Sequence, residues 1–255
     1  MRGAPRGAKR NVGEWHTVTQ AEVDASPEQV WQAIASGPGL NSWFVGTNEV
    51  QPRTGGTLRS TAGGFTDELS VTAWEAPQRV VYRGSQGEDG RFYALEWLVE
   101  GRAGGTLLRC VASGFIPGED WEAEFESLRD GGAMYFLSLV QYLSHFRGRS
   151  VQVVDVFGPP MADAEHGWRL LTDGLGVNGS VKAGDQVRLT PAGLPPIEGV
   201  VYAAAPYVLS VRSGDGLYRF IKAGPSGMVS HRIFSDADGQ RTEQAWRAWL
   251  SGLFA

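Results

Sequence analysis

The chain has 255 residues, 42% of them apolar and 20% charged, which suits one large or two ordinary domains of a soluble globular protein. The net charge of −5 disfavours non-specific binding to nucleic acid, and the absence of any run of about 18 apolar residues disfavours membrane insertion. The single cysteine, Cys110, excludes an intrachain disulfide and a cysteine-based metal cluster.

Residues 1–13 form a leader rich in Gly, Ala and Arg, which we expect to be a flexible solvated tail. Its basic residues are Arg2, Arg6, Lys9 and Arg10. It lacks the apolar core of a signal sequence, so the expected location is cytoplasmic.

The next region predicts a strand followed by two helices. Residues 14–24 alternate in polarity and carry Trp, Val and Thr, as strands do. Ser26 then supplies an N-cap, followed by a proline at the first helical position. Gly37-Pro38-Gly39 is predicted to end this helix, and residues 40–44 to form a short second one.

Six strand-like runs follow, separated by Gly-Gly, Ala-Pro and Asp-Gly turns. The runs are 44–50, 57–61, 68–74, 79–83, 91–100 and 106–113. Their spacing favours an antiparallel meander over alternating β and α units. Cys110 lies in the last run, where a buried small side chain is a better interpretation than a nucleophile.

Residues 119–147 predict a long amphipathic helix. Its acidic first turn and basic last turn suit the helix dipole, and apolar residues recur at steps of three and four. At about 1.5 Å per residue the helix would be roughly 40 Å long, enough to cross a sheet. Gly131 and Gly132 inside it cost about 2 kcal/mol of helix stability relative to alanine. We expect a kink or an emptied wall beside a ligand there, with close packing on a strand as the alternative.

This order of elements resembles the START-like, or SRPBCC, helix-grip superfamily, and within it the bacterial homologues of the heat-shock ATPase activator. The resemblance covers residues 14–148 and is carried by Ala-Ser-Pro-Glu-Gln-Val-Trp at 25–31, Trp43-Phe44, Gly-Gly-Thr-Leu-Arg at 55–59, residues 71–83 and the helix at 121–146. It implies an α+β fold in which a curved antiparallel sheet wraps around a long C-terminal helix, with an internal cavity between them. It implies no particular chemistry, because the superfamily holds carriers, receptors, cyclases and co-chaperone modules.

Residues 149–255 resemble a shortened copy of residues 14–148. The pairs 55–59 with 184–188 and 76–83 with 205–212 lie at one constant spacing, without a gap. Trp31 and Trp168 are further apart, so the counterpart of the short second helix is missing from the copy. Chance similarity of two β-rich stretches is the alternative. If the repeat is real, two helix-grip domains, the second with a smaller cavity or none, pack rigidly across a joint at residues 148 and 149.

Catalytic motifs are not apparent. The histidines at 16, 145, 166 and 231 are scattered without metal-binding spacing, so no metal site is expected. The sequence also lacks a G-x-S-x-G elbow, a phosphate loop and a dinucleotide fingerprint in a strand-to-helix setting, so no cofactor is expected.

Aromatic side chains and the helical glycines are the candidate ligand-binding residues, because they fall in elements that line the cavity in the family resembled. They are Trp43, Phe44, Phe65, Trp74, Trp97, Phe115, Trp121, Gly131, Gly132 and Tyr135. Ordinary core packing is the alternative for each ring. Because strand residues alternate between faces, we expect Trp97 to point inward and Glu96 to be solvated.

Three functions stay open. A binding module would carry or sense a small lipophilic molecule in the first domain. A protein-binding adaptor would show an exposed apolar patch and a filled cavity. A cyclase or dehydratase would need an acid or base that faces the cavity, and the sequence offers no compelling one. We rank the binding module first, the adaptor second and the enzyme third.

Overall fold

The computed structural model describes residues 13–254, and its elements follow the predicted order. The first unit consists of β1 (Glu14–Val23), α1 (Pro27–Ala35), α2 (Gly37–Asn41), β2 (Thr47–Val50), β3 (Thr57–Ala62), β4 (Phe65–Glu75), β5 (Arg79–Gly84), β6 (Phe92–Arg102), β7 (Gly105–Phe115) and α3 (Trp121–His145). The second consists of β8 (Gln152–Pro160), α4 (Ala164–Gly174), β9 (Gln186–Leu189), β10 (Ile197–Ala205), β11 (Val208–Arg212), β12 (Gly216–Ala223), β13 (Ser226–Ile233) and α5 (Gly239–Leu253). Residues 1–12 of the predicted leader lie outside the described residues.

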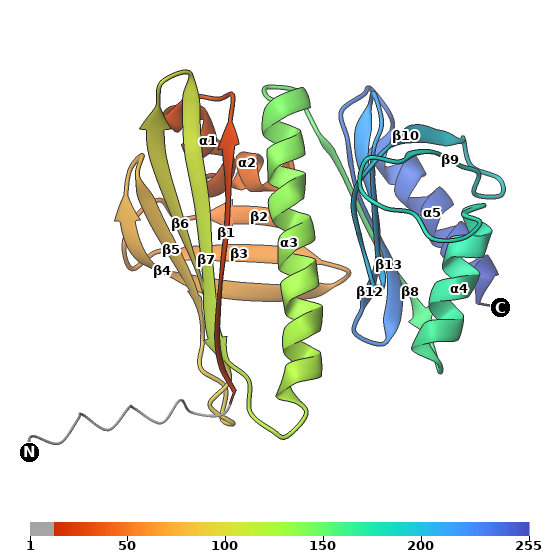
Figure 1. Cartoon of the computed structure of the whole chain (residues 1–255), viewed down its shortest axis with the longest axis horizontal. Helices are drawn as coiled ribbons and strands as arrows, with labels where there is room; N and C mark the ends of the chain where they lie inside the picture. The colour runs from red at the N-terminus through yellow and green to blue at the C-terminus, as the bar shows by residue number, and fades with distance from the viewer. Residues whose placement is uncertain (1–12, 255) are drawn as a thin grey trace, which may run out of the picture.

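The described strands form two antiparallel sheets (Figure 1). The first sheet has the order β1-β7-β6-β5-β4-β3-β2, and the second has the order β8-β13-β12-β11-β10-β9. The second order equals the first once β2 is removed. The predicted α+β helix-grip class is therefore confirmed. The matching order also supports our proposal that the second unit is a shortened copy of the first.

An irregularity recurs in both sheets and refines that proposal. The register shifts between Val71 and Ala73 in β4, and between Val201 and Ala203 in β10. A glycine N–H donates to the residue just before each shift, from Gly55 to the Val71 carbonyl and from Gly184 to the Val201 carbonyl, both at 2.8 Å. The ungapped spacing predicts residue 200 at this position, so the bulge of β10 lies one residue later than expected.

The end of α1 and the start of α2 differ from the prediction. Gly37-Pro38-Gly39 does not separate the two helices but forms the first turn of α2, which ends at Asn41 instead of continuing to residue 44. Ser36 explains the change, because it is both the C-cap of α1 and the N-cap of α2. Its Oγ accepts the N–H of Gly39 at 3.1 Å, so α2 begins directly after it.

Helix α3 lies between the two sheets (Figure 1). On the side of the second sheet, the Ser138 hydroxyl is 2.9 Å from the Tyr202 hydroxyl, and Phe146 stacks on Phe234 with ring centroids 4.3 Å apart. Buried residues of both units belong to one apolar cluster, so the core continues across the boundary between them. Helices α4 and α5 cover the far face of the second sheet. No helix within residues 13–254 is both long and apolar enough to cross a membrane.

Aromatic side chains pack closely between α5 and the second sheet. Trp246 and Trp249 of α5 pack beside Phe220 and the fully buried His231. Nδ1 of His231 accepts the backbone N–H of Arg219 at 3.2 Å, so the neutral ring carries its hydrogen on Nε2. That nitrogen has no hydrogen-bond partner among the described residues, and the centroids of the His231 and Trp246 rings are 4.6 Å apart in an edge-to-face arrangement. Burial, and then the nearby charge of Arg219, lowers the pKa of His231 to about 3.

Acid is therefore expected to destabilise the protein through His231. The unfolded chain binds a proton below the ordinary pKa of 6.5, whereas the native state does not until about pH 3, so stability falls as the pH falls through this window. At 1.36 kcal/mol per pKa unit, the free energy of unfolding should drop by about 3 kcal/mol more between pH 7 and pH 4 in the wild type than in His231→Gln. Urea titrations of both proteins at each pH measure this difference. An equal loss of unfolding free energy with falling pH in the two proteins would contradict the lowered pKa of His231.

The shared core predicts that the two units unfold together. Phe234→Ala removes a ring that stacks on Phe146 and Tyr142 of the other unit, and should lower the free energy of unfolding by about 3 to 5 kcal/mol. Differential scanning calorimetry should show one transition in the wild type and one, at lower temperature, in the variant. Two separated transitions in the wild type would show that the units are independent.

Candidate functional site

An apolar cavity of about 360 Å³ lies between the first sheet and α3. Its wall on the sheet side comes from the inward residues of β1, β6 and β7, and its wall on the helix side comes from residues 127–136 of α3. The loop after α2 closes one end through Trp43 and Phe44. A larger groove, of about 600 Å³, lies on the outer surface, but five charged residues line it: Glu28, Glu75, Arg79, Glu100 and Arg109. The inner cavity is the candidate site because its walls are apolar and close on both sides.

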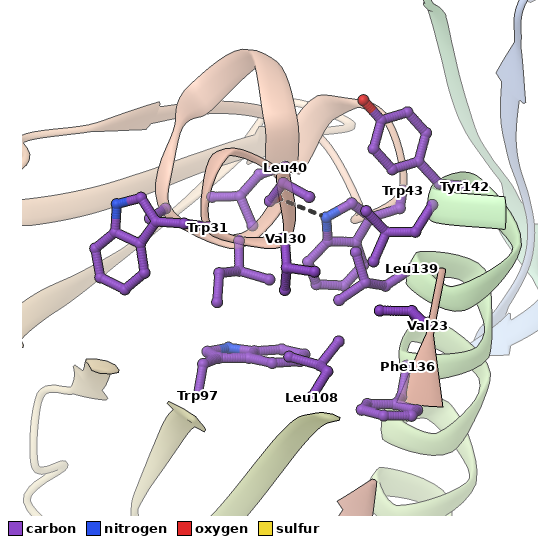
Figure 2. Packing of buried hydrophobic residues seen from close by; sticks show 14 of the residues in the cluster. Val23, Val30, Trp31, Leu40, Trp43, Trp97, Leu108, Phe136, Leu139 and Tyr142 are labelled. Carbon is purple, nitrogen blue, oxygen red and sulfur yellow. Dashed lines mark hydrogen bonds between the residues drawn. The ribbon is translucent and has the colours of Figure 1, made fainter. Parts of the chain in front are cut away.

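Aromatic rings form the closed end of the cavity. Figure 2 shows Trp43 above and Trp97 below, with Phe136 of α3 beside them. The Trp43 and Trp97 centroids are 5.6 Å apart at 72°, and Trp97 lies parallel to Phe136 at 6.2 Å. Nε1 of Trp43 donates to the Ala33 carbonyl at 2.9 Å, which fixes the indole against α1. Phe44 and Tyr135 complete this end with centroids 5.0 Å apart.

The two helical glycines leave space beside the cavity. A Cβ atom added to Gly131 or Gly132 would meet no other atom within 4 Å, and both residues line the cavity. Close packing on a strand, the alternative reading of the pair, is therefore wrong. Helix α3 runs unbroken through both residues, so they thin the helix wall without ending the helix.

Polar groups on the wall are few and mostly uncharged at neutral pH. Thr17 and Thr19 of β1 face inward, opposite Ala112 and Cys110 of β7. Burial raises the pKa of the Cys110 thiol to about 12. Burial also raises the pKa of Tyr93, whose hydroxyl donates to Asp67 at 2.5 Å. Among the described residues that line the cavity there is no Asp, Glu or His, so no side chain there is an evident general base.

Six of the ten predicted ligand-binding residues lie on the cavity wall: Trp43, Phe44, Trp97, Gly131, Gly132 and Tyr135. That they contact a ligand stays a prediction. Trp97 is 4% exposed and points inward, as expected. Glu96 faces the opposite side, where it is half-buried and pairs with Arg79 at 2.6 Å.

The other four residues lie elsewhere. Phe65 begins β4 at the tip of a hairpin that extends past the helix, and is 77% exposed. Trp74 lies under α1, where its ring meets Trp31 at 5.1 Å. Phe115 is on the outer face of β7, since Gly114 next to it packs against the inward ring of Trp15. Trp121 lies in the first turn of α3, beside Phe125.

The sequence analysis missed the contribution of β1. Trp15, Thr17 and Thr19 all line the cavity, and the odd-numbered residues of this strand are consistently less exposed than the even-numbered ones. The alternation that identified the strand also carries this information, because the large apolar Trp15 marks which parity faces inward. Cys110 pairs with the inward Trp97 across β6 and β7, so its position on the wall follows from the same argument.

Among residues 13–254, no group of three His, Cys, Asp or Glu side chains is placed to hold a metal ion. The cavity is thus suited to enclosing an apolar molecule, with hydroxyl groups of β1 available for one or two hydrogen bonds.

Comparison with known proteins places the first unit in context. Residues 24–144 match a family model described as Activator of Hsp90 ATPase homolog 1-like protein. A search of curated proteins finds no significant match.

Solved structures resemble the chain only distantly. Protein MLL2253 from Mesorhizobium loti is 22% identical, with 51% of this chain and 96% of that chain covered and a TM-score of 0.45. The Aha1 dimer from Colwellia psychrerythraea is 22% identical, with 52% and 99% covered and a TM-score of 0.43. DynU16, a protein in the dynemicin biosynthetic locus, is 18% identical, with 93% and 95% covered and a TM-score of 0.41.

Alanine in place of Gly132 should stabilise the protein. The added methyl group meets open space, so the gain in helix propensity, about 1 kcal/mol in the free energy of unfolding, is not offset by a clash. Gly114→Ala is the matched control, because its Cβ would lie 2.4 Å from the Phe92 carbonyl oxygen and must destabilise. Chemical denaturation measures both. A Gly132→Ala protein less stable than the wild type would mean that the space beside the helix is filled.

Proposed function

We propose that the first unit, whose residues 24–144 match the family model described as Activator of Hsp90 ATPase homolog 1-like protein, binds a small lipophilic molecule in this cavity. The observation that carries the proposal is that Gly131 and Gly132 both line the apolar cavity and that an added Cβ atom would meet no neighbour at either position. Two glycines in a helix interior sacrifice about 2 kcal/mol, and alanine would fit at both positions. This loss of helix stability is explained if a ligand occupies the space.

The chemistry of the wall supports binding ahead of catalysis. Affinity would come from burying aromatic and aliphatic surface, at roughly 25 cal/mol per Å² of apolar area removed from water. Orientation would come from the hydroxyls of Thr17 and Thr19. A cyclase or dehydratase would need a group that gains and loses a proton near neutral pH, and burial moves the pKa values of Tyr93 and Cys110 away from that range.

The adaptor alternative has less support. It called for an exposed apolar patch and a filled cavity. The large apolar side chains that are exposed within the described part of the chain are Val18, Phe65, Leu128 and Leu137, and they come from different elements or from separate turns of α3. Scattered side chains of this kind are normal for a protein surface and indicate no docking site.

Filling the cavity from the helix should abolish binding. Gly132→Leu adds a branched side chain at a position that lines the space of about 360 Å³, whereas Ala123→Leu adds a similar side chain to the same helix at a position that does not line it. We expect Gly132→Leu to weaken the binding of the hydrophobic dye Nile red by about tenfold or more, equal to about 1.4 kcal/mol, and Ala123→Leu to leave it unchanged. Fluorescence titration gives both Kd values.

Native mass spectrometry of freshly purified protein is the complementary measurement, since a co-purified molecule would appear as added mass that Gly132→Leu removes. Absence of dye binding by the wild type, together with no added mass, would refute the proposal and favour the adaptor.

A further inference from the structure

Three charged residues of the second unit are buried beside the cavity of the first. Arg219 of β12 and Arg232 of β13 are both 0% exposed, and the side chain of Asp155 of β8 is 5% exposed. Removing an ion from water costs several kcal/mol unless hydrogen bonds and opposite charges replace the solvent. The partners of these three side chains therefore show what the arrangement holds in place.

Arg219 binds the first unit through a main-chain oxygen and an aromatic ring. Its Nη1 donates to the Trp43 carbonyl, and its guanidinium lies 5.2 Å from the centroid of the Tyr135 ring. Within its own sheet, Nε donates to the Ser230 carbonyl at 2.6 Å and Nη2 to the Ser230 hydroxyl at 2.9 Å. Each of the three guanidinium nitrogens thus has an acceptor. The two groups that it contacts in the first unit, Trp43 and Tyr135, both line the cavity.

Arg232 and Asp155 bind the residues that follow. Nη2 of Arg232 donates to the Phe44 carbonyl, and its two terminal nitrogens bind the Asp155 carboxylate at 3.0 and 3.2 Å. The same carboxylate accepts the backbone N–H of Gly46 at 2.8 Å. Burial alone would raise the pKa of Asp155, but the charge and hydrogen bonds of Arg232 outweigh it and hold the pKa below its ordinary value. Asp155 is therefore ionised and able to hold both groups.

The second unit thus binds three main-chain groups of the loop at residues 43–46, which forms the closed end of the cavity. We propose that Arg219 and Arg232 are positioning residues for this cavity: they fix Trp43, Phe44 and Tyr135, and so determine how readily the cavity opens. This inference deepens the proposed function. Any effect of the two arginines on ligand affinity rests on that function. It also gives the second unit a role in the site of the first.

Cys110 provides a reporter for the opening of the cavity. It is the single cysteine of the chain and lies on the sheet wall, across β6 and β7 from Trp97. Because its side chain is only partly exposed, N-ethylmaleimide should modify it more slowly in the intact protein than in the unfolded chain. Loss of the Arg219 contacts should free the loop and Tyr135, and speed the reaction.

Full-length Arg219→Met and Arg232→Met proteins test the proposal. Leu250→Ala is a control that destabilises the core of the second unit away from the loop, and Tyr202→Phe removes the hydrogen bond to Ser138 across the same interface. Rates are compared at a fixed interval below each melting temperature, so that global unfolding contributes equally. We expect the Arg variants to react about tenfold faster than the wild type and both controls to match the wild type.

The outcomes separate positioning from plain stability. If the Arg variants react no faster than Leu250→Ala, the arginines only stabilise the interface and the proposal is overturned. Asp155→Asn keeps the shape of the side chain but removes its charge, and serves as the test variant if an Arg variant does not fold. A smaller acceleration of the Cys110 reaction in Asp155→Asn supports the proposal. An unchanged rate overturns it. Nile red should bind more weakly to the variants that react faster. If the wild type binds no dye, the binding function fails, whereas the Cys110 rates still decide whether the arginines fix the wall.

Discussion

Helix α3 must pack against a sheet on each of its two sides, and the rest of the molecule depends on how it does so. Its C-terminal half meets both requirements: Met134, Leu139 and Leu143 are buried, while Ser138 hydrogen-bonds across to Tyr202. Its N-terminal half is more exposed, with Leu128 48% accessible, and it borders the cavity. The same helix therefore joins the two units at one end and borders the cavity at the other. One continuous element carries both features, which links assembly of the chain to the shape of the site.

The helix also shows how stability and an open site oppose each other. Interiors of proteins are close-packed, and an apolar space without contents forfeits dispersion contacts along all of its walls. Gly131 and Gly132 enlarge such a space and lower helix propensity as well. Proteins stay only a few kcal/mol above the stability that function requires, so a loss of this size is tolerated mainly where a site needs it. The buried rings of Trp43, Trp97 and Phe136 offset part of it by packing tightly at the closed end (Figure 2).

Much of this architecture could be predicted from sequence, because it depends on periodicity and local signals. Alternating polarity predicted the strands, apolar residues at steps of three and four predicted α3, and the N-cap Ser26 predicted the start of α1. The inward Trp97 followed from strand parity, and the inward Trp15 could have followed in the same way. The exposed position of Phe65 could not be predicted in this way, because it depends on how far a hairpin extends beyond the helix. The roles of Arg219 and Arg232 could not be predicted either, because charged residues are rarely buried and the partners of these two in the first unit lie more than 170 positions away in the chain. The helices and strands follow from local sequence patterns, whereas the interface between the two units depends on contacts between distant parts of the chain.

The arginines recognise the loop through its main chain, and this has a consequence for how such proteins diversify. Carbonyl and N–H groups are the same whatever the side chain, so the docking of the second unit places no demand on the identity of residue 44. Trp43 is more constrained, because its indole is also bonded to Ala33. Position 44 can therefore change in size and polarity while the loop keeps its place. In a lineage of related proteins, the lining of the cavity can change at that position without loss of the two-unit assembly, and a designer can begin there.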